Sequence, residues 1–150
     1  MVGFLLFGSA VFPAQAAFTN LYVFGDSISA TTDNPTLGPN FYGRRYSNGR
    51  VWIEVLAQRQ GLTLYPTNNW SYFGNTSTSM VANVSSFHSN ATNALFVIWV
   101  NNADLYYPAQ NGTNMNVWTN AINQSLTNHF KAITNLYYAK GARTLIMPNA

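Results

Sequence analysis

The strongest constraint on the fold is an uninterrupted apolar run at residues 94–100, which reads Ala-Leu-Phe-Val-Ile-Trp-Val. The run shows no alternation of apolar and polar residues, so a strand formed by it would be apolar on both faces. Such strands lie in the middle of parallel sheets whose two faces are covered by helices. The run therefore predicts the central strand of an α/β domain.

Further predicted strands and helices alternate on both sides of this run. The additional strands are expected at residues 21–24, 62–65 and 143–147, of which the second is weak and ends at Pro66. The helices are expected at residues 51–59, 76–87 and 117–137, the last closed by Lys140-Gly141. Residues 29–48 show no periodicity and predict a long loop, which in a compact domain points to function or to substrate access.

This order of elements implies right-handed βαβ units. We therefore predict an α/β fold with three αβα layers around a flavodoxin-like, doubly wound parallel sheet. The chain stops at Ala150, directly after a predicted strand, so we expect the sheet to be incomplete at the C-terminus.

The composition excludes several classes of protein. Charged residues make up only 7% of the chain, against roughly 25% in an average domain. The net charge of +3 rests on seven basic residues, which are too sparse to follow a phosphate backbone, so we expect no nucleic-acid partner. The chain has no cysteine, which excludes a disulfide scaffold, a thiolate nucleophile and a cysteine zinc site.

The N-terminus has the features of an export signal. Residues 2–12 are apolar, Pro13 breaks the run, and Ala14-Gln15-Ala16 matches the small-x-small pattern of a cleavage site. We predict a signal peptide at residues 1–16, a hydrolase domain at residues 17–150, a secreted or periplasmic protein, and no integral membrane segment after processing. No Lys or Arg precedes the apolar run, which leaves a buried first strand or a misplaced start codon as the alternative.

Polar residues follow three of the predicted elements, at positions where ligands bind in parallel sheets. Gly25-Asp26-Ser27 follows the first strand, residues 71–74 follow the second, and Asn101-Asn102-Ala103-Asp104 follows the central one. Because ligands bind beyond the carboxyl ends of such strands, these groups should meet at one crevice. A serine hydroxyl, a glycine N–H and an amide side chain are what acyl transfer needs, namely a nucleophile and donors for an oxyanion.

Four segments then stand in a specific order. Residues 24–29 read Phe-Gly-Asp-Ser-Ile-Ser, and residues 43–52 read Gly-Arg-Arg-Tyr-Ser-Asn-Gly-Arg-Val-Trp. Gly74 follows, and then Gly-Ala-Arg at residues 141–143 with Pro148-Asn149. Over residues 21–150 the chain resembles the GDSL (SGNH) family of serine esterases and lipases. The resemblance implies that Ser27 is the nucleophile, that the N–H groups of Ser27 and Gly74 bind the oxyanion, and that no cofactor or metal takes part. The implied substrate is a small-molecule, lipid or acylated-carbohydrate ester.

Two departures from the family pattern bear on activity. The third family block, Gly-x-Asn-Asp, supplies a further oxyanion donor, but alignment on Asp104 places Ala103 at the Asn position. A one-residue shift would bring Asn102 into the site, and Asn101 is the other candidate. The family's Asp-x-x-His motif is absent, so we expect the catalytic Asp and His downstream of residue 150. A triad of Ser27, Asp104 and His129 is conceivable, although no spacing supports it.

Several alternatives remain open at this point. Ser27 could cap a helix after its strand, and Gly74 or Asn102 could be turn residues. His88 and His129 are expected to be structural or exposed. A flavodoxin-like module could instead bind phosphate or flavin at residues 27–32 through backbone N–H groups. A third possibility is a catalytically inert fragment.

Overall fold

The computed structural model describes residues 17–89, 91–110, 112 and 114–148. A parallel sheet is formed by β1 (Asn20–Gly25), β2 (Ala94–Trp99) and β3 (Thr144–Ile146), with β2 in the middle. Val97 of β2 lies in register with Val23 of β1 and with Ile146 of β3. The apolar run is thus confirmed as a buried central strand. The expected signal peptide, residues 1–16, lies outside the described residues.

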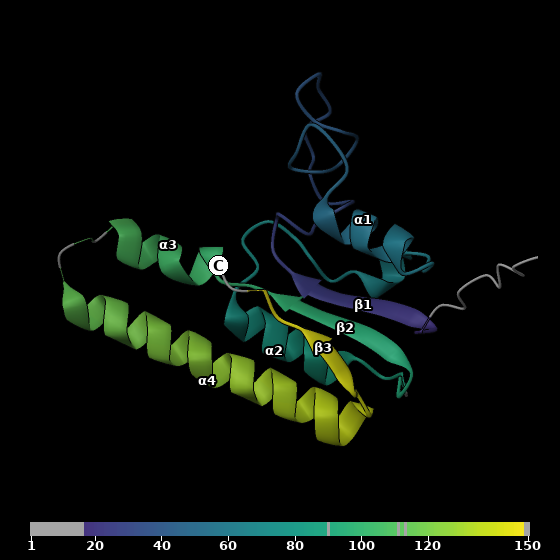
Figure 1. The fold of residues 1–150 in the computed structure, drawn as a ribbon. Coiled ribbons are helices and arrows are strands. Elements are labelled where there is room, and N and C mark those ends of the chain that lie inside the picture. Colours follow the sequence, from purple (N-terminus) through teal and green to yellow (C-terminus); the bar gives the residue numbers. More distant parts are fainter. Residues whose placement is uncertain (1–16, 90, 111, 113, 149–150) are drawn as a thin grey trace, which may run out of the picture.

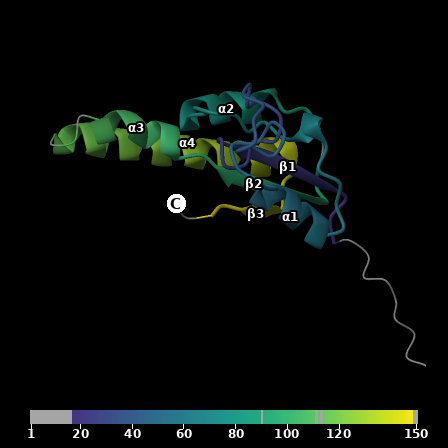
Figure 2. The ribbon, with the colours of Figure 1, turned by 90° about the horizontal axis from the view of Figure 1, so that it is seen from above.

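Helices cover both faces of the sheet. The described helices are α1 (Trp52–Arg59), α2 (Ser77–Ser86), α3 (Asn102–Gln110) and α4 (Met115–Lys140). Leu21 and Val23 of β1 pack with Ile53 of α1, whereas the intervening Tyr22 and Phe24 pack in a second cluster with side chains of α2 and α4. Figures 1 and 2 show α1 on one side of the sheet and α2 and α4 on the other, which confirms the three-layer α/β fold.

The two clusters fix the strand ends that matter for function. Leu21, Val23 and Phe24 are fully buried, and burial of a side chain of this size contributes roughly 1.5–3 kcal/mol. Strand β1 is therefore held firmly up to Gly25, its last residue. The residues that follow Gly25 are therefore attached to a strand that the core holds in place.

The predicted helices at residues 76–87 and 117–137 are present as α2 and α4. Thr76 caps α2, since its Oγ1 accepts a hydrogen bond from the Ser79 N–H at 3.2 Å. Gly141 ends α4 in the left-handed conformation, with φ 77°, and the N–H of the next residue, Ala142, donates to the Leu136 carbonyl at 2.9 Å. A residue with a side chain would be strained there, which explains the glycine.

The predicted weak strand at residues 62–65 is wrong. Its two leucines pack against the α1 cluster, but the segment has no strand pairing, and a short 3-10 helix, η1 (Pro66–Asn68), follows it. Pairing on this side of β1 is reduced to one parallel bridge between Val23 and Asn69. Alternation of apolar residues therefore reflects packing alone, and Pro66 has no N–H with which to continue a ladder.

Helix α3 was not expected from the sequence. It begins directly after the central strand, at Asn102, and contains Pro108 in its second half. Of its residues only Pro108 is buried, so the apolar periodicity that identifies a helix is weak here. Figure 1 shows α3 beside the first part of α4, away from the sheet.

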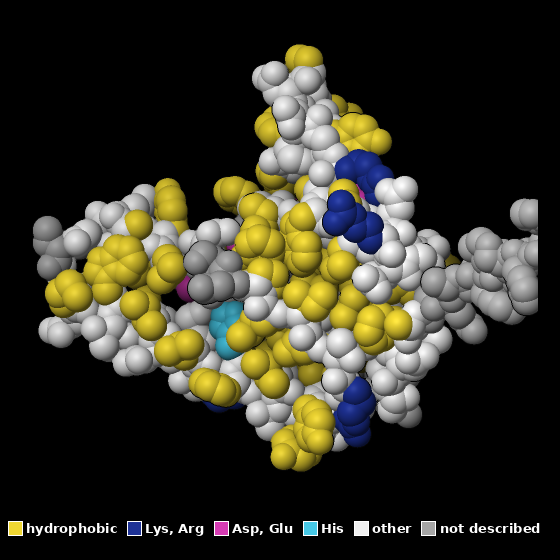
Figure 3. Space-filling view, in the orientation of Figure 1, with side chains coloured by type: hydrophobic (Ala, Val, Ile, Leu, Met, Phe, Trp, Pro, Cys, Tyr) yellow, Lys and Arg dark blue, Asp and Glu magenta, His cyan; other side chains and the backbone are white. Residues whose placement is uncertain are grey.

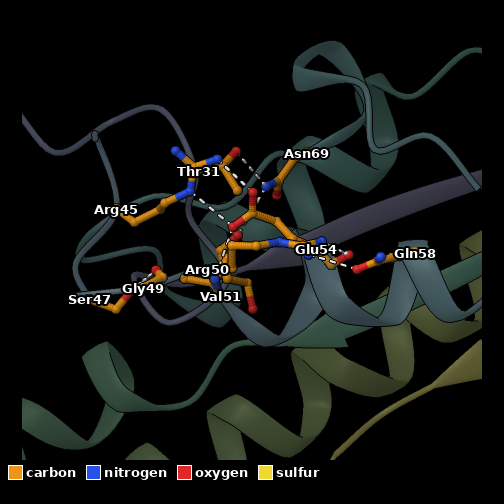
Figure 4. Close-up of polar contacts among 10 residues, drawn as sticks. Thr31, Arg45, Ser47, Gly49, Arg50, Val51, Glu54, Gln58 and Asn69 are labelled. Atoms are coloured by element: carbon orange, nitrogen blue, oxygen red, sulfur yellow. Dashed lines mark hydrogen bonds and ion pairs between the residues drawn. The ribbon is translucent and has the colours of Figure 1, made fainter. Parts of the chain in front are cut away.

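The long loop between β1 and α1 is confirmed, and it is attached to α1 by an ion pair. Arg45 Nε and Nη2 donate to the Glu54 Oε2 and Oε1 atoms at 2.9 and 2.6 Å (Figure 4). Glu54 Oε2 also accepts the Val51 N–H at the start of α1, at 2.9 Å. Hydrogen bonding from Arg45 holds the pKa of the Glu54 carboxyl below its ordinary value. The loop is thereby tied to a helix of the core.

Part of the surface is hydrophobic. Figure 3 shows hydrophobic side chains gathered between α1 and α4, over the side of the sheet that β3 borders. Ile122, Leu126 and Met147 are exposed and line one depression together with the buried His129. Among the described residues, no helix combines the length and the hydropathy that crossing a membrane requires.

Candidate active site

Ser27, Gly74 and Asn102 lie around one pocket at the carboxyl edge of the sheet. Ser27 follows β1, Gly74 precedes α2, and Asn102 is the first residue of α3. The pocket has a volume of about 480 Å³ and is lined by Asp26, Ser27, Phe73, Gly74, Thr76, Asn102, Ala103 and Tyr106. The three candidate residues from the sequence are therefore brought together, although they are far apart in the chain.

Ser27 lies in a tight turn directly after β1. The Ser29 N–H donates to the Asp26 carbonyl at 3.1 Å, and the Ile28 N–H donates to the Asp26 Oδ1 atom at 3.2 Å. No helix follows within residues 26–51, so the interpretation of Ser27 as a helix cap is wrong. Ser27 is partly exposed. Its N–H and its hydroxyl have no hydrogen-bond partner in the described part of the chain, so both are free to act on a ligand.

Gly25 makes this turn possible. A Cβ at this position would lie 2.6 Å from Ser71 Oγ and 2.7 Å from Ser29 Cβ. On its other side, the Gly25 carbonyl accepts a hydrogen bond from Asn75 Nδ2 at 2.7 Å, and Asn75 is fully buried. The backbone before Ser27 is thus packed directly against the segment that carries Gly74.

Gly74 lines the pocket in a backbone conformation that favours glycine. Its φ is +76°, in the left-handed region, while a Cβ there would meet no atom within 4 Å. Conformation, and not crowding, therefore requires a glycine. The next residue closes a turn, as the Asn75 N–H donates to the Tyr72 carbonyl at 3.3 Å. Within residues 17–89 and the other described segments, no atom accepts the Gly74 N–H.

The structure separates Asn102 from Asn101. Asn102 Nδ2 donates to Asp26 Oδ2 at 2.8 Å and lines the Ser27 pocket. Asn101 points elsewhere, since its Oδ1 accepts a 3.4 Å hydrogen bond from Ser125 Oγ of α4 and it lines the depression beside His129. Ala103 lies on the pocket wall. Of the two asparagines, Asn102 is the one placed beside Ser27, and the buried Asp26 orients its amide.

Asp104 and His129 do not form a triad with Ser27. The Asp104 carboxylate accepts the Ser77 N–H and the Ser77 hydroxyl, both at 2.8 Å, and so stabilises the first turn of α2. His129 Nδ1 lies 2.8 Å from the Ser125 carbonyl one turn earlier in α4. His88 is exposed, and neither histidine lines the Ser27 pocket. Among the described residues no three His, Cys, Asp or Glu side chains gather as a metal site.

The loop at residues 27–32 is poorly suited to cradle a phosphate. The N–H groups of Ile28, Ser29 and Ala30 donate within the turn itself. The Ser29 hydroxyl is buried and accepts the indole N–H of Trp52 at 3.0 Å. An anion site needs several free N–H groups pointing at one place. Three of the six N–H groups at residues 27–32 are thus already used within the turn, which disfavours a flavodoxin-like phosphate site.

Three polar residues that support the site were not identified from the sequence. Asp26 holds Asn102, Asn75 holds Gly25, and Asp33 accepts the N–H of Phe73, the residue before Gly74. The only signal for Asp26 was its place next to Ser27. Asn75 binds a residue that is 50 positions away in the sequence, and Asp33 binds one that is 40 positions away. No local sequence pattern predicts such contacts.

Comparison with known families identifies the family to which the chain belongs. The sequence model of the GDSL-like lipase/acylhydrolase family matches residues 21–150. The chain belongs to this family. The match covers the sheet from the second residue of β1 onward, the three segments around the pocket and the four helices of the described residues. A search of curated proteins finds no match for the chain. Membership makes the GDSL domain a hydrolase domain for ester substrates.

Proposed function

We propose that the protein is an exported carboxylic-ester hydrolase in which Ser27 is the nucleophile. The observation that carries this proposal is the arrangement around the pocket. A free serine hydroxyl lies beside two backbone N–H groups without acceptors and one oriented amide. Donors that converge on one place stabilise a tetrahedral oxyanion, and the position of all these groups around one pocket supports that role.

The proposed hydrolysis proceeds in two steps, acylation of Ser27 and hydrolysis of the acyl-enzyme. Ser27 Oγ attacks the ester carbonyl carbon and loses its proton to a base. The carbonyl oxygen becomes an oxyanion and accepts hydrogen bonds from the Ser27 N–H, the Gly74 N–H and Asn102 Nδ2. Collapse of this intermediate expels the alcohol, which takes the proton and leaves an acyl-Ser27 ester. Water then attacks this ester, releases the carboxylic acid and restores the Ser27 hydroxyl.

Asp26 has a supporting role in these steps. Its carboxylate is buried and accepts one hydrogen of the Asn102 amide at 2.8 Å. This bond fixes the direction of the amide before the substrate arrives. A donor that is already in place needs no reorganisation when the oxyanion forms, and its effect on the rate is correspondingly large.

The described site does not supply the base that takes the Ser27 proton, so the base is a further part of the proposal. Neither histidine within the described residues lines the pocket. We therefore propose that an Asp-x-x-His segment after residue 150 brings an imidazole to Ser27, as the family resemblance implies. Export rests on the signal-like residues 1–16. The acyl and alcohol parts of the substrate stay within the range of small-molecule, lipid and acylated-carbohydrate esters.

A fluorophosphonate probe tests the nucleophile in the folded, full-length protein. It should form one covalent adduct, which peptide mass spectrometry places on Ser27. The Ser27→Ala variant should lose the adduct, while Ser89→Ala, a change at an exposed serine, should keep it. Asn102→Ala should lower kcat roughly 100- to 1,000-fold, the loss found when one oxyanion donor is removed. A folded protein that the probe leaves unlabelled at Ser27 would end this proposal.

A further inference from the structure

We assign the Gly74 N–H to the oxyanion. Gly74 itself makes no hydrogen bond among the described residues, but the residues on both sides of it do. Glycine is the least restricted residue, and a φ of +76° is one of several conformations open to it. The direction of its N–H therefore depends on how firmly Phe73 and Asn75 are fixed.

On one side, Asn75 ties the turn to β1. Its Nδ2 donates to the Gly25 carbonyl at 2.7 Å and to the Trp70 carbonyl at 3.4 Å, and its side chain is fully buried. This contact relates the Gly74 turn to the strand that carries Ser27. It fixes the C-terminal side of Gly74 only.

On the other side, the long loop supplies Asp33 and Tyr46. Asp33 Oδ2 accepts the Phe73 N–H at 2.7 Å and the Tyr46 hydroxyl at 3.3 Å. The Tyr46 ring also packs on the Phe73 ring, with their centroids 5.4 Å apart. One carboxylate oxygen and one phenol thus hold the backbone and the side chain of the residue that precedes Gly74.

The loop residues beside this pair are themselves immobilised. Arg45, next to Tyr46, forms the ion pair with Glu54 of α1 (Figure 4). Asn34, next to Asp33, is buried, and its Nδ2 donates to the Arg45 carbonyl at 2.9 Å. A continuous series of polar contacts therefore runs from α1 through the loop to Phe73.

The choice of a carboxylate at position 33 is not explained by local stability. Asp33 Oδ1 is buried and has no hydrogen-bond partner among the described residues, which is an unfavourable state for a polar atom. The other oxygen carries both contacts. A charged acceptor makes these hydrogen bonds stronger than a neutral one would.

We propose that Asp33 and Tyr46 are positioning residues that fix the Gly74 N–H in the direction of the oxyanion. This inference rests on the proposed function, because it assigns a task to the loop within that same site. Neither side chain touches the reacting atoms. They act through Phe73, and they make the long loop part of the catalytic apparatus.

The test separates positioning from folding by comparing kcat with KM in the full-length enzyme. Asp33→Ala should lower kcat about 100-fold, since a displacement of about 1 Å in a catalytic group has an effect of this order. KM should change less than about threefold, because the oxyanion exists only in the transition state. Tyr46→Phe removes one hydrogen bond and keeps the ring, so kcat should fall roughly three- to tenfold. Leu37→Ala, an exposed change in the same loop, should leave both constants unaltered.

A second readout is the affinity of an alkylboronic acid, which forms a tetrahedral adduct with a serine nucleophile. Its affinity should fall in parallel with kcat across the two variants. If the Asp33→Ala variant proves unstable, Tyr46→Phe decides, since it keeps the packing on Phe73. A labelled, active wild type in which both folded variants keep kcat would overturn the positioning role alone. A wild type that is neither labelled at Ser27 nor active would overturn the proposed function and this inference together.

Discussion

Replacement of Gly25 by alanine should destabilise the fold at the residue that supports Ser27. The new Cβ would lie 2.6 Å from Ser71 Oγ and 2.7 Å from Ser29 Cβ, so atoms must move apart by about 0.8 Å to reach ordinary contact at 3.4 Å. Ser71 can rotate, but Ser29 Cβ cannot leave without its backbone, and its Oγ accepts the Trp52 indole N–H. Insertion of one methyl group into such packing costs about 1–3 kcal/mol.

Urea unfolding followed by tryptophan fluorescence measures this cost, and a thermal scan supplements it. For a domain of this size about 1–3 kcal/mol corresponds to a fall in Tm of roughly 2–12 °C. The matched control is Gly49→Ala, since a Cβ at Gly49 meets no atom within 4 Å and its φ is not positive. We expect the control to stay within about 0.5 kcal/mol of the wild type. Equal stability of the two variants would refute the close packing of Gly25 against Ser29 and Ser71.

Two further predictions concern charged residues outside the pocket. Asp104→Asn should lower the free energy of unfolding by about 1–3 kcal/mol, because two hydrogen bonds from Ser77 at the start of α2 are lost or weakened, while fluorophosphonate still labels Ser27. Loss of labelling in a folded Asp104→Asn protein would instead support a catalytic Asp104. Glu54→Gln should be less stable than the wild type at pH 7, and the difference should shrink at pH 3. The pKa of Glu54 is lowered in the folded state by Arg45, so its contribution is present above the unfolded value of about 4.3 and is lost as the pH falls through the folded value. Urea midpoints at both pH values measure this, and a constant difference would contradict the role of the ion pair.

The layers of the fold could be predicted from the sequence because they depend on burial. An unbroken apolar run at residues 94–100 has few places in a small domain other than the middle of a covered sheet. The helix stop at Gly141 follows from the left-handed conformation that glycine tolerates. The meeting of Ser27 and Asn102 at one edge follows from the rule that the carboxyl ends of parallel strands meet there, since the two residues follow β1 and β2. Gly74 reaches the same edge although the strand predicted before it is absent.

The remaining features depend on contacts that no local pattern encodes. Residues 62–65 have the alternation of a strand, but their leucines serve packing against α1 without pairing. Helix α3 buries only Pro108, so its sequence shows no apolar stripe. The choice between Asn101 and Asn102 is decided by where α3 begins, because a step of one residue on a helix turns a side chain by about 100°. Asn102 faces Asp26, whereas Asn101 faces α4.

The positions of the backbone donors in the site follow from where N–H groups are left without an acceptor. Backbone N–H groups inside strands and helices are already paired, so free ones occur where such elements end or turn. Ser27 and Gly74 stand at such places, one after β1 and one before α2. A free N–H in a turn is available but not rigid, and the structure compensates for this with buried or charge-assisted contacts on each flank. Asn75 connects the Gly74 turn to β1, and Asp33 connects it to the loop that Arg45 ties to α1. Under the positioning role that we propose for Asp33, the long loop gives the Gly74 turn a second support besides β1.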